Sequence, residues 1–130
     1  MISELESCGV FCLEDIMQLI NREEVLKKID ALKNKDVYIH MEMTMGAYTS
    51  HRDQSVHPAS NFIKNVIIKY EHGTLSESSP YRIGLKINGG WVYAEGMTHW
   101  DETDKDRVII SGNDKDGKLI AALQISTEPF

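Results

Sequence analysis

The chain has no run of apolar residues near the roughly 20 that a helix needs to cross a bilayer, so it predicts no transmembrane segment. No basic residue precedes Arg22, whereas Glu4 and Glu6 lie near the start, which is the opposite of a secretory signal. Cysteine is limited to Cys8 and Cys12, which lie too close together to cross-link a domain. We therefore expect a protein of the reducing cytoplasm.

Positive charge is also scarce. Lysine and arginine number 14 against 20 acidic residues, which gives a formal net charge of −6. Nucleic acids and anionic membrane surfaces both require clustered positive charge, so we expect neither as a partner. With 130 residues, of which 42% are hydrophobic and 26% charged, the chain has the size and composition of one globular domain.

The first 16 residues differ in character from the rest, since they mix Ser, Glu, Cys and Gly with scattered apolar residues. We expect residues 1–16 to form an N-terminal extension that is disordered or loosely docked. The alternative is a short helix through residues 13–19. In either case residues 17–130 make the single β-rich domain.

One helix is predicted at the start of that domain. Asn21 with Glu24 three residues later forms a capping box, which marks a helix N-terminus. The helix continues to about Lys33, and Asn34 is a suitable stop residue. Its apolar stripe at helical spacing comprises Val25, Leu26, Ile29 and Leu32.

The strongest strand signal is the stretch 81–100. Apolar and polar side chains alternate strictly over 81–87, which is the period of a strand. Asn88-Gly89-Gly90 supplies the positive φ angles of a hairpin turn, and the second arm, 91–100, carries both tryptophans.

Further strands are predicted by the same alternation at 36–44, 47–51, 61–72 (bent at Asn65), 108–110 and 118–126, with a Ser-rich connector at 73–80. Short connections between consecutive strands favour antiparallel pairing. The fold class is therefore mainly β: an antiparallel β-barrel or sandwich of about seven strands with one N-terminal helix. Gly84 and Gly96, inside strands, would suit the bends of a barrel wall.

Four side chains form the best candidate for chemistry. His40 and Glu42 are two apart on one predicted strand, and Glu95 and His99 are four apart on another, so each pair shares a face. If the two faces meet, the set could bind zinc or another divalent ion, or perform acid–base catalysis. The commoner origin of such a pattern is a solvated or dimer-facing polar side of a sheet, and both interpretations stay open.

Three aromatic residues, Tyr38, Trp91 and Tyr93, are expected near the same polar face. Aromatic side chains beside polar groups line ligand pockets and interface hot spots. They are also favoured on any half-buried strand.

Several blocks of the sequence resemble the YojF family of Firmicute bacteria. The blocks are Val37-Tyr-Ile-His-Met-Glu, Pro80-Tyr-Arg-Ile-Gly-Leu-Lys, the most specific one, Gly89-Gly-Trp-Val-Tyr-Ala-Glu-Gly-Met-Thr-His, and the closing Glu128-Pro-Phe. The likeness runs from about residue 17 to the end. It implies a small, mostly β cytoplasmic protein without an assigned activity, whose genes often lie beside a deacetylase of low-molecular-weight thiol (bacillithiol) metabolism.

Two functional hypotheses follow. The first is a non-enzymatic binding or accessory module, expected to be a homodimer, in which a partner protein or small ligand contacts the 91–100 arm, because no complete catalytic signature is present. The second is a small metal-dependent enzyme that uses His40, Glu42, Glu95 and His99.

Overall fold

The structure, a computed structural model, describes residues 17–45, 55 and 57–130. The predicted extension 1–16 and the predicted strand 47–51 both lie outside the described residues. Within it there is one helix, α3 (Arg22–Ala31), and the strands are β1 (Met17–Leu19), β2 (Val37–Met45), β3 (Ala59–Ile68), β4 (His72–Leu75), β5 (Tyr81–Ile87), β6 (Gly90–Met97), β7 (His99–Asp101), β8 (Val108–Asn113) and β9 (Leu119–Ser126). None of its helices is both long and apolar enough to cross a membrane.

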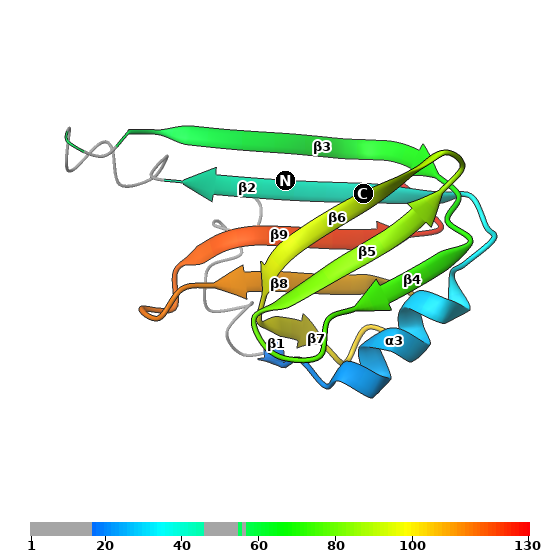
Figure 1. Ribbon diagram of the computed structural model, residues 1–130, viewed down its shortest axis with the longest axis horizontal. Coiled ribbons are helices and arrows are strands. Elements are labelled where there is room, and N and C mark those ends of the chain that lie inside the picture. The colour runs from blue at the N-terminus through cyan, green and yellow to red at the C-terminus, as the bar shows by residue number, and fades with distance from the viewer. Residues whose placement is uncertain (1–16, 46–54, 56) are drawn as a thin grey trace.

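The strands form two antiparallel sheets that pack face to face (Figure 1). The larger has the order β1-β7-β8-β9-β2-β3, and the smaller has the order β4-β5-β6. The prediction of a mainly β, antiparallel protein is confirmed. The barrel alternative is wrong, because the described strands make two open sheets that do not close on one another.

The described residues contain nine strands, whereas the sequence predicts about seven. β1 lies where the alternative prediction placed a helix, and β4 lies partly within the Ser-rich stretch that was predicted to be a connector. β7 arises because the predicted 91–100 arm divides in two. Glycine and hydroxyl residues within β4 conceal the alternation that identifies a strand, although Leu75 is buried.

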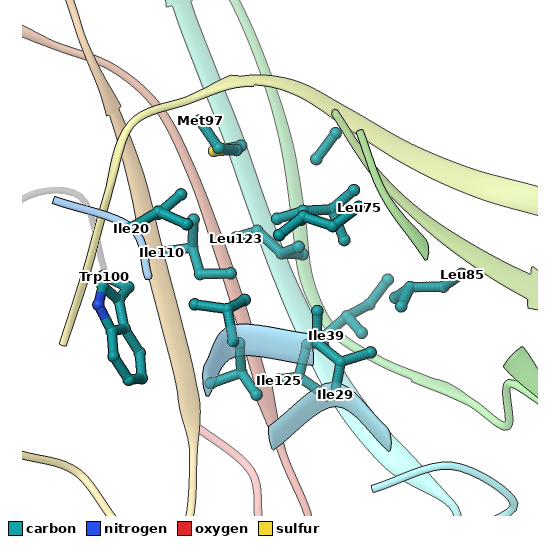
Figure 2. Packing of buried hydrophobic residues seen from close by; sticks show 14 of the residues in the cluster. Ile20, Ile29, Ile39, Leu75, Leu85, Met97, Trp100, Ile110, Leu123 and Ile125 are labelled. Atoms are coloured by element: carbon teal, nitrogen blue, oxygen red, sulfur yellow. The ribbon is translucent and has the colours of Figure 1, made fainter. Parts of the chain in front are cut away.

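The core lies between the sheets and is closed at one end by α3 (Figures 1 and 2). Asn21 is the N-cap and accepts a hydrogen bond from the Glu24 backbone N–H, as predicted. The helix ends at Ala31, slightly earlier than expected, and Asn34 adopts a positive φ of 60°. The core side chains shown with labels in Figure 2 are Ile20, Ile29, Ile39, Leu75, Leu85, Met97, Trp100, Ile110, Leu123 and Ile125.

The chain changes sheets at Thr98. Glu95 pairs with Arg82 and Met97 with Tyr81, so Gly96, with φ of 89°, is left out of the β5–β6 register as a bulge. The Thr98 N–H then donates to the Ser111 carbonyl, which belongs to β8 of the larger sheet. The strand therefore ends at Met97, and its continuation runs as β7 in the other layer.

A second bulge lies in β3. Ile39 pairs with Val66 and His40 with Lys64, which leaves Asn65 unpaired at a positive φ of 55°. The bend predicted at Asn65 is therefore present as a bulge. β3 is the outermost strand of the larger sheet (Figure 1). Most of its side chains are exposed.

Candidate functional site

His40 and Glu42 form a buried pair on β2. The Nε2 atom of His40 lies 2.6 Å from Oε1 of Glu42, and only 1% and 4% of these residues are exposed. With Nε2 hydrogen-bonded to the carboxylate, the second ring nitrogen is left for another role. That nitrogen, Nδ1, has no hydrogen-bond partner within the described part of the chain.

The pair lies on the face of the larger sheet that points away from the smaller sheet. Ile39 and Met41 point into the space between the sheets, and the alternating His40 and Glu42 point the other way. The ring of Phe130 packs edge-on against the His40 ring, with centroids 6.3 Å apart. The end of the chain therefore helps to enclose the imidazole.

His99 shares this face but lies too far away to join the pair. Residues directly opposite in antiparallel strands point to the same face, and Glu42, Ala122, Ser111 and His99 follow one another across β2, β9, β8 and β7. Three strand spacings of ~4.8 Å separate Glu42 from His99, which is on the order of 14 Å. The Nδ1 atom of His99 lies 2.6 Å from the Thr98 hydroxyl instead.

Glu95 lies in the other sheet. It forms an exposed ion pair with Arg82, at 3.0 Å, on the outer face of the smaller sheet. The prediction that Glu95 and His99 share a strand face is wrong, because the Gly96 bulge and the change of sheet at Thr98 separate them. The four predicted residues do not converge, and no cluster of three or more His, Cys, Asp or Glu suited to a metal occurs among the described residues.

The aromatic residues are likewise divided between the two sheets. Tyr38 shares its face with His40, whereas Trp91 and Tyr93 lie on the outer face of the smaller sheet. Trp91 and Tyr93 stack with centroids 5.4 Å apart and planes at 8°, and they remain 42% and 52% exposed. Arg82 lies over the Tyr93 ring, 5.7 Å from its centroid.

Gly84 makes room for this stack. It is paired with Tyr93, and a Cβ atom at this position would lie 2.8 Å from Cε1 of the tyrosine ring. The glycine therefore admits an aromatic ring across the strand, which differs from the barrel bend that its position predicted.

A hollow of about 210 Å³ opens beside β6. Residues of β6 line one side of it, and residues of β2, β3 and β9 line the other. Its lining is mostly apolar and includes Met41, Met43, Ile63, Tyr93 and Met97. Sequence reasoning identified Tyr93 alone of these five, since an apolar residue on an alternating strand predicts core.

Known proteins resemble this chain over most of its length. Residues 19–130 match a family model described as "Protein of unknown function (DUF1806)". The chain is 35% identical over 114 residues to the "Uncharacterized protein YojF" of Bacillus subtilis (strain 168), covering 88% of this chain and 98% of that protein. It also matches the crystal structure of the Bacillus subtilis YojF protein with a TM-score of 0.72 and 33% identity, over 88% of this chain and 96% of that one.

Proposed function

Because the chain belongs to the YojF family, we propose on that premise that it is a non-enzymatic binding or accessory module of the bacterial cytoplasm. Its binding site is the hollow lined by residues of β6, β2, β3 and β9, together with the Trp91–Tyr93 stack. The ligand is an extended segment of a partner protein.

The observation that carries this proposal is the incomplete cover of the larger sheet. β6 is the last strand of the smaller sheet, and no strand of the described residues pairs with its outer edge. Beside that edge, Met43 and Ile63 remain partly exposed in the lining of the hollow. An extended peptide can add a strand to such an edge through main-chain hydrogen bonds, and its alternate side chains can fill the apolar hollow.

The aromatic stack supplies the second part of the site. Tryptophan, tyrosine and arginine are the residues that most often dominate binding energy at protein interfaces. Trp91, Tyr93 and Arg82 lie together on the same outer face, next to the hollow. A partner that crosses β6 would contact the stack and the hollow at once.

The family resemblance suggests which partner to test first. Genes of this family often lie beside a deacetylase of low-molecular-weight thiol metabolism, so the accessory role is proposed for bacillithiol metabolism. The deacetylase from the same organism is the first probe.

The experiment is a quantitative pull-down and calorimetric titration of that deacetylase with the full chain. Truncation of a hot-spot residue costs about 2 kcal/mol or more, so Tyr93→Ala and Trp91→Ala should each weaken binding at least about tenfold. Leu19→Ala is the matched control, because Leu19 is an exposed apolar residue on the remote β1 edge. Equal affinities of all four proteins, or no binding by the wild type, would remove the proposal.

A second candidate function rests on the buried His40–Glu42 pair. A carboxylate that holds one imidazole nitrogen fixes the ring and makes the other nitrogen a better metal ligand or proton acceptor. The second candidate is therefore a metal-dependent enzyme in which His40 is the central residue and Glu95 and His99 take no part. Metal analysis of protein purified without chelator, and the thermal shift on adding zinc or manganese, test it. A shift that His40→Leu abolishes supports the candidate, whereas no bound metal and no shift would eliminate it.

A further inference from the structure

The outer edge of β3 is the longest unpaired strand edge that the described residues present. β3 spans Ala59–Ile68, and within that part of the chain only β2 pairs with it. Ten residues at ~3.3 Å each make an edge of roughly 33 Å. Every second backbone N–H and C=O along such an edge faces outward without a partner in the sheet.

Both faces of this strand carry large apolar side chains that are exposed. Phe62 and Ile67 are 55% and 54% exposed on the outer face of the sheet, and Ile63 and Val66 are exposed on the inner face. Four of the nine exposed large hydrophobic residues among those described therefore lie on this single strand. A long apolar edge of this kind pairs with another strand unless it is covered.

Charge favours a second copy of the same chain as the covering strand. Each copy carries a net charge of −6, so two copies repel one another over most of their surfaces. β3 contains no acidic residue, and its only charged side chain is Lys64. Two copies can therefore approach along β3 without opposing carboxylates.

The strand is also complementary to itself in one register. The Asn65 bulge interrupts the edge, so regular pairing is restricted to residues 59–64. A two-fold axis at Phe62 places Phe62 opposite its own copy and Lys64 opposite Ser60, which keeps the two lysines apart. Aromatic pairs directly opposite one another stabilise antiparallel strands, and like charges in that position destabilise them.

We infer that the β3 edges of two copies pair antiparallel about Phe62 to form a symmetric homodimer with one continuous sheet. The interface is isologous, since the same patch is used on both copies. It borders the site proposed at β6, since Asn61, Phe62 and Ile63 also line the hollow. The dimer is measured without the partner protein, so the two proposals can fail independently.

The test is the mass in solution of the full chain and two variants, measured by light scattering after size exclusion. The wild type should have twice the 14.8 kDa mass of one chain. The double variant Ser60→Lys/Phe62→Lys should be a monomer, because in this register it places one new lysine opposite Lys64 and the other opposite its own copy. Leu19→Lys alters the edge strand at the opposite end of the same sheet, where Leu19 is 74% exposed, and should remain a dimer.

A wild type that is monomeric at all concentrations, or a double variant that stays dimeric, would overturn the inference. Hydrogen exchange on the wild type covers the case in which the double variant fails to fold. The amides of residues 59–64 should gain protection as the protein concentration rises, whereas unchanged protection there would equally overturn the inference.

Discussion

Asn65 and the final residue, Phe130, hold one another by two hydrogen bonds. The Asn65 Nδ2 atom donates to the Phe130 carbonyl oxygen at 3.1 Å, and the Phe130 backbone N–H donates to Asn65 Oδ1 at 2.8 Å. The bulge of β3 thereby fixes the end of the chain, and the Phe130 ring is held against His40. The left-handed conformation of Asn65 thus accompanies a specific contact across the sheet.

This contact predicts different costs for two substitutions of Asn65. Asn65→Gly permits the positive φ but removes both hydrogen bonds, so it should lower the free energy of unfolding by about 1–2 kcal/mol. Asn65→Ala should cost a further ~1 kcal/mol, because a Cβ atom disfavours the left-handed region. Urea denaturation of both variants measures the difference. Alanine at least as stable as glycine would contradict the assigned conformation.

The close approach of Gly112 to the backbone of Gly96 predicts different stabilities for two glycine substitutions. A Cβ atom on Gly112 would lie 2.3 Å from the carbonyl oxygen of Gly96, which is backbone and cannot turn aside. Gly112→Ala should therefore destabilise the fold by about 1–3 kcal/mol or more, as overpacking does. Gly90→Ala is the control, since no atom lies within 4 Å of a Cβ there. Equal melting temperatures of the two variants would contradict the close approach of Gly112 to the Gly96 carbonyl oxygen.

Asp104 predicts part of the acid sensitivity of the protein. Burial raises the pKa of its carboxyl, but hydrogen bonds from the backbone N–H groups of Asp106 and Arg107, and the Arg107 side chain, outweigh burial and lower the pKa below its usual value. The unfolded chain then binds more protons, so this contribution to stability is present above about pH 4 and is lost as the pH falls through the folded pKa. Asp104→Asn should flatten the dependence of unfolding free energy on pH below about 4. The same slope in both proteins would refute this assignment.

The buried pair predicts strong coupling between His40 and Glu42. Removing one partner of a buried ionisable pair typically costs about 3–5 kcal/mol, because the buried polar group that remains loses a hydrogen bond. His40→Leu and Glu42→Met should each fall near this range, and the double variant should cost less than the sum of the two. Denaturant titration of the four proteins completes the cycle. Additive costs would mean that the two side chains do not stabilise one another.

Local patterns were sufficient for part of this fold. The alternation through Tyr81–Ile87, the Asn21 cap and the break at Asn65 each depend on neighbours within a few residues. All three correspond to features of the structure. The pairing of His40 with Glu42 followed in the same way, since residues two apart on a strand share a face.

The exchange of sheets at Thr98 could not be read from the same patterns. In the sequence, Gly96 between Glu95 and Met97 is compatible with a continuous strand. Its positive φ, and the bulge it makes against Tyr81 and Arg82, are features of the three-dimensional structure. One residue left out of register moves every later side chain to the other face. For this reason the prediction kept Glu95 and His99 together, whereas the structure places them in different sheets.

The most direct test of the proposed binding site uses the two tryptophans, of which Trp91 is 42% exposed and Trp100 is buried. In a Trp100→Phe variant, the remaining emission reports on Trp91 alone. Titration with the deacetylase should shift that emission to shorter wavelength in a saturable way, because the partner excludes water from the indole, and Tyr93→Ala should raise the midpoint at least about tenfold. An emission spectrum of Trp91 that stays unchanged at saturating partner would contradict the account.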